Sequence, residues 1–343
     1  MSATMKDLAY MAGVSRATVY RALSGHGRVD PKTQMRICAL AESMGYKPNL
    51  AAKSLANRHK NYKIGCIINS IGNNFFEDVI AGAKQAAEEY ATFGISVIIK
   101  ASKGFNVQTQ LDLINDMLQN NVNAIAITPI NDEVIIAKLN EVIEAGVIVV
   151  AVTADISGVD YLAYVGCNHE KSGRIAADLI SLITNGKSVI GVIAGSLKML
   201  GHKQRIDGLK AVIAQKYPHM NLCSIVENQD DNIISYNKVS QLLKDQPDVD
   251  VLFFVAAGTG GGIRAVIENG FADKVKIITF DLTETNRKYL SEGIISAVLC
   301  QEPFKQGYTA IKLISDYLIS SQKPTSSKIY TQTQINVGES LDF

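Results

Sequence analysis

The sequence has few of the features that mark secreted, disulfide-bonded or membrane proteins. Its cysteines are scattered, odd in number and never spaced as CxxC (Cys38, Cys66, Cys167, Cys223 and Cys300). This spacing disfavours a disulfide framework or a zinc site and predicts free, buried thiols in a reducing compartment. The N-terminal stretch MSATMKDLAYMAG has no apolar core of a secretion signal, and no apolar run approaches bilayer-spanning length. We therefore expect a cytoplasmic protein with no membrane partner.

Catalytic and cofactor motifs are also missing. No Ser/His/Asp order and no pair of carboxylates stands in a motif context. The stretch GTGGG at Gly258–Gly262 lacks the lysine of a P-loop and the spacing GxGxxG. It therefore predicts a close turn between a strand and a helix rather than a phosphate site. Cys167 and His169 have no third ligand nearby and do not indicate a metal site. We expect no enzymatic activity, no cofactor and no metal ion.

The charge of the chain is unevenly distributed. A chain of 343 residues is too long for one compact domain, and its net charge is only +1. Residues 1–60 carry ten lysines and arginines against three acidic residues, a charge of +7, and the remaining chain stands at −6. A basic head on a mildly acidic body indicates an anionic partner for the head, most often nucleic acid. From charge alone, a solvated basic helical bundle remains the alternative.

The basic head contains the start and stop signals of three short helices. Thr4 is placed to cap a first helix that Gly13 ends, and Ser15 is placed to cap a second. Asp30 and Pro31 are typical of the first residues of a third helix. Two capped helices joined by a glycine-containing turn predict a helix-turn-helix, in which the second helix reaches the edges of DNA bases.

The second helix of the head offers side chains suited to DNA. Arg16 and Arg21 can each bond a guanine bidentately, whereas Ala17 can offer only a methyl contact to thymine. Hydroxyl groups at helix starts are natural donors to phosphates (Ser15, Thr18 and Thr33). We expect the start of this helix to be the base-reading surface.

Residues 4–56 closely resemble the DNA-binding head and hinge of the LacI/GalR family of bacterial transcription regulators. The segments that carry this resemblance are MKDLAYMAGVSRATVYRALSG and MGYKPNLAAKSLA. The resemblance implies a hinge helix at residues 49–56, folded when two chains pair on DNA, with Leu55 wedged into the minor groove. It also implies a homodimer that reads a pseudo-palindromic operator in double-stranded DNA. Tyr20 departs from the serine common in the family, which removes a phosphate contact or adds a base contact. The predicted DNA-contacting residues are Thr4, Ser15, Arg16, Ala17, Thr18, Tyr20, Arg21, Arg28, Thr33, Asn49, Ala52 and Leu55.

From Ile64 onward the pattern changes to apolar runs that alternate with amphipathic helices. This alternation predicts parallel, doubly wound sheets that are buried on both faces. About 280 residues are too many for one such sheet, so we expect two α/β subdomains with a ligand cleft between them. The second subdomain is expected to begin with YLAYVG at residues 161–166 and to end with a helix at Ile319. The predicted domains are a helix-turn-helix head at 1–47, a hinge and linker at 48–62, and an effector-binding body at 63–343.

Residues 63–335 resemble the periplasmic sugar-binding fold that serves as the effector domain of these regulators, in its ribose-binding-type branch. The carrying segments include NNFFEDVIAGAKQAA, GSLKMLGHKQRIDGL and ITFDLTETNRKYLSEG. Aromatic faces that cover C–H surfaces and polar groups that bond hydroxyls suit a sugar. The cleft residues that the resemblance implies are Asn73, Phe75, Phe76, Arg205, Asp281 and Gln301.

The body departs from the ribose-binding pattern at two strand ends. Thr153 and Ala154 stand where an Asp-Arg pair is common, with Asp155 offset, and Thr259 supplies a hydroxyl where an Asn-Asp pair is common. We include Thr153 and Thr259 in the predicted cleft and expect a sugar-like ligand other than ribose. Each cleft residue has a structural alternative. The two phenylalanines can belong to the core, Gln301 can be a strand-end cap, and Arg205 with Asp281 can be an ordinary ion pair. His202 is expected at the pocket rim or on the surface.

These features together predict a DNA-binding repressor of carbohydrate uptake or catabolism genes that a small sugar-like ligand controls allosterically. The alternative is a sugar- or nucleotide-processing α/β enzyme with a helical cap. The basic head and hinge favour the regulator, because an enzyme has no need of them.

Overall fold

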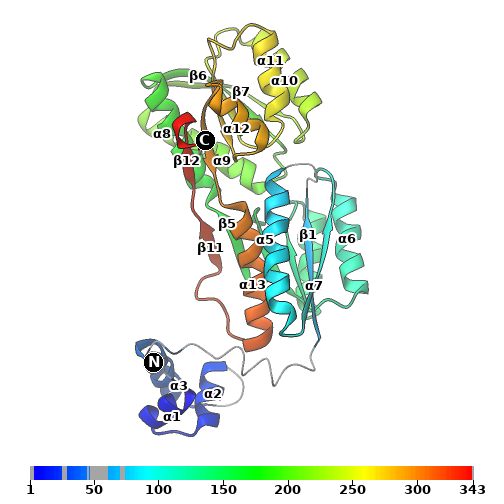
Figure 1. Cartoon of the computed structure of the whole chain (residues 1–343), viewed down its shortest axis with the longest axis vertical. Coiled ribbons are helices and arrows are strands. Elements are labelled where there is room, and N and C mark those ends of the chain that lie inside the picture. Colours follow the sequence, from blue (N-terminus) through cyan, green and yellow to red (C-terminus); the bar gives the residue numbers. More distant parts are fainter. Residues whose placement is uncertain (1–3, 25–28, 45, 47–60, 70–73, 342–343) are drawn as a thin grey trace.

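A computed structural model of the chain describes residues 4–24, 29–44, 46, 61–69 and 74–341. Arg28, Asn49, Ala52, Leu55 and Asn73 lie outside these described residues, as does the predicted hinge helix. The described parts form a helical head and an α/β body of two lobes, with the first lobe between the head and the second lobe (Figure 1). The predicted fold class is confirmed.

The head consists of α1 (Met5–Ala12), α2 (Arg16–Ser24) and α3 (Pro31–Ser43). Thr4 caps α1 through a reciprocal pair of hydrogen bonds with Asp7, and Gly13 ends that helix in the left-handed conformation at φ 60°. Leu8, Val19 and Ile37, one residue from each helix, are fully buried against one another. The predicted caps and the glycine turn are therefore confirmed, and they orient α2 relative to α1.

The first lobe is built on a parallel six-stranded sheet in the order β11-β5-β4-β3-β1-β2. Helices α5 and α13 pack on one face of this sheet, and α6 and α7 pack on the other. Its strands are β1 (Tyr62–Ile68), β2 (Ile95–Ala101), β3 (Ala124–Ile127), β4 (Ile148–Val152), β5 (Ala163–Cys167) and β11 (Lys328–Thr331). Its helices are α5 (Asn74–Ala91), α6 (Val107–Gln119), α7 (Glu133–Glu144) and α13 (Pro303–Ser320).

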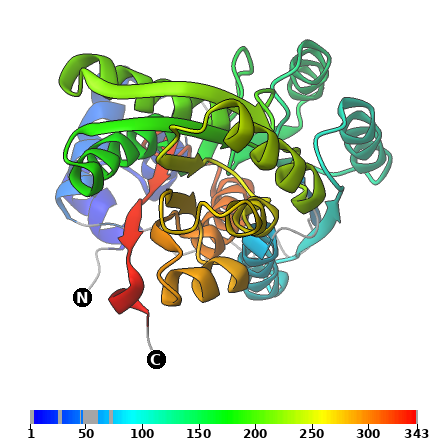
Figure 2. The ribbon, with the colours of Figure 1, turned by 90° about the horizontal axis from the view of Figure 1, so that it is seen from above.

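The second lobe repeats this strand order as β12-β10-β9-β8-β6-β7, with β12 antiparallel to β10. Helices α8 and α9 cover one face of the sheet, and α10, α11 and α12 lie over the other (Figure 2). Its strands are β6 (Lys187–Ala194), β7 (His219–Glu227), β8 (Val251–Phe254), β9 (Lys276–Phe280), β10 (Ile295–Cys300) and β12 (Gln334–Asn336). Its helices are α8 (His169–Thr184), α9 (Leu200–Lys216), α10 (Asn232–Asp245), α11 (Thr259–Glu268), α12 (Glu284–Ser291) and the 3-10 turn η1 (Gly338–Ser340).

The boundary between the lobes corrects the sequence-based expectation. The sequence pattern predicts that YLAYVG and the last helix belong to the second subdomain, but β5 pairs with β4 in the first sheet, and α13 packs against α5 in the first lobe. The chain therefore crosses between the lobes after β5, after β10 and after β11. An apolar strand pattern reports that a strand is buried, but it does not report which sheet buries it.

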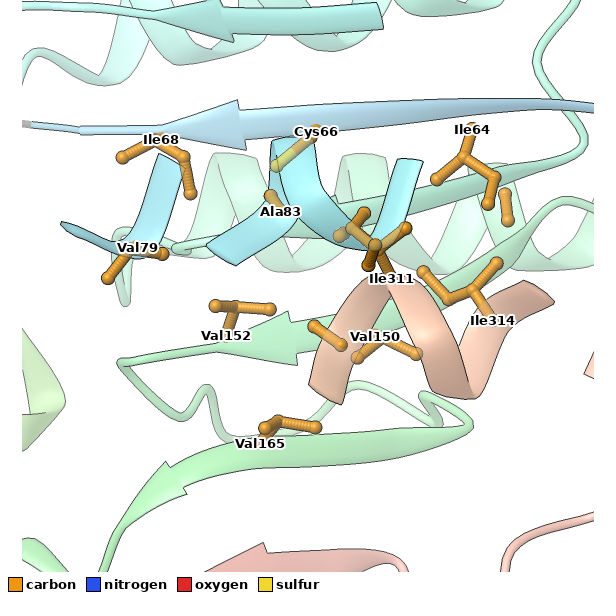
Figure 3. Packing of buried hydrophobic residues seen from close by; sticks show 14 of the residues in the cluster. Ile64, Cys66, Ile68, Val79, Ala83, Val150, Val152, Val165, Ile311 and Ile314 are labelled. Carbon is orange, nitrogen blue, oxygen red and sulfur yellow. The ribbon is translucent and has the colours of Figure 1, made fainter. Parts of the chain in front are cut away.

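The core of the first lobe lies between its sheet and the pair α5 and α13. Ile68, Val150 and Val165 project from three strands toward Val79 of α5 and Ile311 of α13 (Figure 3). All five side chains are fully buried, and each contributes about 1.5–3 kcal/mol relative to remaining exposed. This packing holds the carboxyl ends of the first sheet in place, which is where the candidate site lies.

Candidate functional site

A cavity of 140 Å³ lies between the lobes, at the carboxyl ends of strands from both sheets. Since one enclosed water molecule needs about 10–15 Å³, this volume admits roughly ten non-hydrogen atoms. That is the size of a single small polar molecule. Ligands in doubly wound α/β proteins bind at this edge of the sheet.

Two equivalent residues mark the floor of the cavity. Thr153 follows β4 and Asp281 follows β9, the fourth strands of the two lobes in chain order, and both have a left-handed backbone at φ 62° and 63°. The Thr153 N–H donates to Val165 O at 2.9 Å, and the Asp281 N–H donates to Leu299 O at 2.8 Å. A left-handed β-branched residue such as Thr153 is strained, and such strain is concentrated at functional sites.

All the predicted cleft residues within the described ranges line this one cavity. They come from six separate segments of the chain (Phe75, Phe76, Thr153, Arg205, Thr259, Asp281 and Gln301). Phe75 and Phe76 are each 8% exposed and contact each other edge-to-face, with ring centroids 5.0 Å apart. Both rings also belong to the hydrophobic core of the first lobe. The two phenylalanines therefore serve as core residues and as cavity-lining residues at the same time.

Arg205 and Asp281 are joined through an amide rather than as an ion pair. Arg205 Nη2 donates to Gln301 Oε1 at 2.7 Å, and Gln301 Nε2 donates to Asp281 Oδ2 at 2.9 Å. Arg205 Nη1 donates to Val255 O, and the guanidinium carbon lies 3.6 Å from the centroid of the Phe280 ring. Arg205 and Asp281 are not among the salt bridges of the described residues. The ion-pair alternative is therefore wrong, and Gln301 is a bridging side chain rather than only a strand-end cap.

The ionisation of Asp281 is poised near neutrality. Burial raises the pKa of its carboxyl to about 7, although Arg205 and the Gln301 amide both act to lower the pKa. Burial has the largest effect on this pKa, ahead of the positive charge of Arg205 and the hydrogen bond from Gln301. A carboxyl with such a pKa can respond to a ligand that donates a hydrogen bond to it.

Two histidines line the cavity as neutral side chains. Burial lowers the pKa of His169 and of His202 to about 3, with a further contribution from the positive charge of Arg205. His169 Nε2 lies 2.7 Å from Thr153 O, and the His202 ring meets Phe105 edge-to-face at 6.0 Å. His202 is expected from sequence at the pocket rim or on the surface but lines the cavity, and a role for His169 in the cavity was not predicted.

The offset acid of the first lobe turns away from the cavity. Asp155 Oδ1 accepts from Tyr161 Oη at 2.5 Å, and Asp155 Oδ2 forms a salt bridge with Lys328 of β11. Lys328 also lies over the rings of Tyr161 and Tyr164. The carboxylate therefore secures a crossing strand near the cavity, and Thr153 lines the cavity instead, with its hydroxyl 3.1 Å from that of Thr128.

Several lining residues were missed by sequence reasoning. Asp230 and Asn232 follow β7 in the polar run ENQDDN, a strand-end signal that was not used. Asn286 gave no local signal, because it lies within α12, yet it is 1% exposed and donates to Phe280 O and Asp281 O. The remaining missed polar and aromatic residues are Asn74, Phe105, His169, Phe280, Thr283 and Thr285.

A direct contact between the lobes lies beside the cavity. Lys198, in the loop between β6 and α9, forms a 3.1 Å salt bridge with Asp132, which caps α7 of the first lobe. The Asn131 N–H donates to Lys198 O at 3.1 Å, and Met199 packs into the core of the first lobe. We call Asn131, Asp132, Lys198 and Met199 the cross-lobe contact. It forms when the lobes are close together.

The predicted DNA-contacting side chains of the head lie on α2 and at the helix caps. Arg16, Ala17, Tyr20 and Arg21 are exposed on α2, and Arg21 Nε donates to Ala17 O at 3.3 Å. The remaining described residues of the prediction all make capping contacts: Ser15 with Thr18, Thr33 with Asp30, and Thr4 with Asp7. Their hydroxyls therefore stabilise helix starts, and α2 presents the surface available for bases.

Metal-site and membrane-span features are both absent from the described ranges. No group of three or more His, Cys, Asp or Glu side chains is arranged to hold a metal ion there. Within the same ranges, no helix combines the length and the apolar character that crossing a bilayer requires.

Comparisons with known proteins identify both parts of the chain. Residues 4–49 match the bacterial regulatory proteins of the lacI family, and residues 64–322 match the periplasmic binding protein domain. The chain is 26% identical over 325 residues to the catabolite control protein A of Priestia megaterium, covering 93% of each. It is 25% identical over 296 residues to the lactose operon repressor of Escherichia coli, covering 84% of this chain and 78% of that protein. Its fold resembles the glucose-galactose binding protein GanP of Geobacillus stearothermophilus, with a TM-score of 0.77, 23% identity, and coverage of 83% and 100%.

Proposed function

Because this chain belongs to the lacI family of bacterial regulatory proteins and carries a periplasmic binding protein domain, we propose that it represses carbohydrate uptake or catabolism genes. It acts in the cytoplasm as a homodimer on a pseudo-palindromic operator, and a small sugar-like ligand controls it. The functional division is a head at 1–47, a hinge and linker at 48–62, and an effector-binding body at 63–343. The observation that carries the proposal is one cavity lined by polar groups from both lobes of a body that bears a DNA-binding head.

The DNA-binding role of the head is supported by the exposure of α2. Arg16 and Ala17 begin this helix and are exposed, while Val19 is buried against α1 and α3. The charge of +7 on residues 1–60 favours association with the phosphate backbone, and two heads together read more bases than one. We propose that Arg16 and Arg21 read bases. Leu55, outside the described residues, is proposed to enter the minor groove between paired hinges.

Replacement of Arg16 tests base reading. Arg16→Ala is expected to cost about 1–3 kcal/mol on the promoter region of the protein's own gene and to relax base preference at one position of each half-site. Lys32→Ala is the matched control, because it removes one exposed positive charge at the start of α3. The control should weaken binding to the promoter and to random DNA equally. An Arg16 variant that did the same would identify Arg16 as a phosphate contact.

The effector role of the cavity is supported by its chemistry and by its position between the lobes. Rings from the first lobe face an arginine, an amide and a carboxyl from the second lobe, as expected for a molecule with both C–H faces and hydroxyl groups. A ligand that touches both sets favours the closed arrangement of the lobes, by no more than its difference in affinity for the two arrangements. Closure rotates the first lobes of the two chains relative to each other and thereby changes the pairing of the hinges that join them to the heads.

The test of ligand control is an operator titration with the full chain. Gel-shift affinity for the promoter region is measured without sugar and with D-glucose, D-galactose and other monosaccharides in turn. At least one sugar is expected to change the affinity for the promoter while leaving binding to random DNA unchanged. If no sugar changes it, and calorimetry detects no sugar binding, the proposed effector role is wrong.

The alternative of an α/β enzyme with a helical cap is not supported. The relatives that cover most of the chain are named as a control protein and a repressor. We therefore assign the cavity to binding and signalling rather than to turnover of its ligand.

A further inference from the structure

Three buried polar atoms of cavity-lining residues have no hydrogen-bond partner within the described part of the chain. They are Arg205 Nε, Asp281 Oδ1 and Asn286 Oδ1. Both hydrogens of the Asn286 amide nitrogen point to carbonyl oxygens, Phe280 O at 3.0 Å and Asp281 O at 2.8 Å. The orientation of this amide is therefore set, and the oxygen is the end left open. The open set consists of two acceptors and one donor.

The positive charge of Arg205 is already engaged by the protein. Its two terminal nitrogens donate to Val255 O and to Gln301 Oε1, and its planar face covers the Phe280 ring. A carboxylate or phosphate is best held by two parallel N–H groups of a guanidinium. With both terminal nitrogens committed to protein acceptors, Arg205 is poorly placed to hold an anion in this way.

No other cation among the described lining residues compensates for the acidic groups of the cavity. Asp230 adds a second carboxylate beside Asp281, and both histidines are neutral because burial lowers the pKa of each to about 3. The described lining contains no lysine and no second arginine. Residues 70–73, which precede the lining residue Asn74, contain no ionisable side chain. Arg205 is therefore the one cation of the described lining, set against Asp230 and the partly ionised Asp281.

These groups distinguish a hydroxyl from an anion. A sugar hydroxyl can donate to Asp281 Oδ1 or Asn286 Oδ1 and accept from Arg205 Nε, whereas a carboxylate or phosphate oxygen can only accept. An anionic group set against these atoms would leave Asn286 Oδ1, and Asp281 Oδ1 when that carboxyl is ionised, buried without a donor, and it would lie close to Asp230. An unpaired buried acceptor discriminates strongly between related ligands.

We propose that this cavity selects uncharged polyhydroxylated sugars and rejects sugar acids and sugar phosphates, with Asp281 and Asn286 as the residues that set the selectivity. This inference rests on the proposed effector role of the cavity. It adds the charge class of the ligand and assigns a specificity role to Asn286, which lies outside the strand-end positions predicted from sequence.

The test is calorimetry on the full chain with matched pairs of ligands. The pairs are D-glucose with D-glucose 6-phosphate, D-glucose with D-glucuronate, and D-galactose with D-galacturonate. For each neutral sugar that binds, the anionic partner is expected to bind at least about tenfold more weakly. An anionic partner that binds as tightly as its neutral sugar overturns the selectivity while leaving the effector role intact. Absence of binding by every ligand, with no shift of the melting temperature, overturns both.

Two variants test the assignment to particular residues. Asp281→Asn keeps the shape of the side chain and removes its charge. It should weaken binding of the neutral sugar, and it should reduce the ratio of neutral-sugar affinity to anionic-sugar affinity by about tenfold or more. Asn286→Ala should weaken the neutral sugar, and its melting curve reports whether the fold survives the loss of two bonds to carbonyls. Asp112→Asn, an exposed change on α6, should alter neither quantity. If the ratio of the two affinities is unchanged in Asp281→Asn, the proposed role of Asp281 is wrong. If a variant fails to fold, the ligand pairs measured on the wild-type protein still decide the selectivity.

Discussion

The two lobes share a strand order and differ in what they bring to the cavity. Each places a left-handed residue after its fourth strand, Thr153 in the first lobe and Asp281 in the second. In the first lobe the nearby carboxylate, Asp155, binds Lys328 on a crossing strand, whereas in the second lobe the carboxylate itself lies at the cavity. The equivalent left-handed position therefore lines the cavity in both lobes, but it carries a carboxyl only in the second, while the first lobe uses its offset carboxylate, Asp155, to support a crossing strand.

This difference indicates a division of labour. The second lobe supplies the hydrogen-bonded series Arg205, Gln301 and Asp281, while the first lobe supplies Thr153 and the rings of Phe75, Phe76 and Phe105. Polar recognition is thus concentrated in one lobe, and the other lobe covers the ligand. We expect substitutions in the second lobe to change affinity and specificity, and those in the first lobe to change mainly closure.

The largest expected effects come from glycines that the two lobes use in the same way. A Cβ at Gly307 of α13 would lie 1.9 Å from Val79 O, and a Cβ at Gly208 of α9 would lie 2.1 Å from Glu170 O. Gly307→Ala and Gly208→Ala should each destabilise the protein by about 3 kcal/mol or more, because backbone cannot move aside easily. Gly338→Ala is the control, since its Cβ would make only an ordinary contact at 3.5 Å. Urea unfolding measures all three. Tolerance of alanine in one lobe alone would show that the lobes are packed differently.

Ligand affinity should separate the lobes most clearly. Asp281→Ala is expected to weaken binding of the sugar that changes operator affinity by about 2–3 kcal/mol, roughly 30- to 150-fold. It should also abolish the effect of that sugar on operator binding. Thr153→Ala should cost about 0.5–1.5 kcal/mol, because a neutral hydroxyl is lost. Calorimetry and operator titration measure both variants, and operator affinity without ligand should stay within a few-fold of wild type. Equal losses would contradict the division of labour, and normal binding by Asp281→Ala would exclude the proposed pocket.

The pH dependence of stability should reveal the buried acid of the second lobe. The folded-state pKa of Asp281 is raised to about 7, so between pH values of about 4 and 7 the unfolded chain releases this proton while the folded protein retains it. Stability is therefore lost as the pH rises through this window, and the loss is constant above about 7. The charged or titratable groups near this carboxyl are Arg205 on α9, Asp78 on α5 and Cys167 on β5. Cys300 at the end of β10 and Arg287 on α12 line a neighbouring pocket that Asp281 also lines.

Asp281→Asn removes this penalty. The ligand-free variant should melt roughly 3 °C or more above wild type at pH 7.5, and the difference should shrink toward pH 4.5. Asp112→Asn on α6 serves as the control and should show no such trend. A variant whose advantage grew as the pH fell would show that the carboxylate is stabilised in the fold, contrary to its raised pKa.

The smallest expected effect concerns the cross-lobe contact. Lys198→Ala removes the exposed salt bridge to Asp132, which is worth about 0.2–1 kcal/mol, and should weaken ligand affinity by up to about fivefold, because closure is less favourable. Lys203→Ala is matched, since Lys203 pairs with Asp207 within α9 and spans no cleft. Ligand titration at two salt concentrations compares them. Equal effects of the two variants would show that closure does not depend on this contact.

Local features of the fold were predictable from sequence, whereas the assembly of the site was only partly so. The caps at Thr4, Ser15 and Asp30 were predicted because each depends on residues three positions away. The strand-end positions of Thr153 and Asp281 followed from the apolar runs before them. The contribution of Asn286 was not predictable, because it depends on the packing of α12 against the end of β9.

The sequence by itself determined the helix-turn-helix head, the alternating α/β body and most strand-end residues of the cavity. It did so because caps, glycine turns and apolar periodicity act over a few neighbouring residues. Only the tertiary structure decided that β5 and α13 belong to the first lobe, that Gln301 separates Arg205 from Asp281, and that Asp155 turns toward Lys328. Those outcomes depend on contacts between residues tens to hundreds of positions apart, where burial and the competition for hydrogen-bond partners decide among arrangements that are locally equivalent.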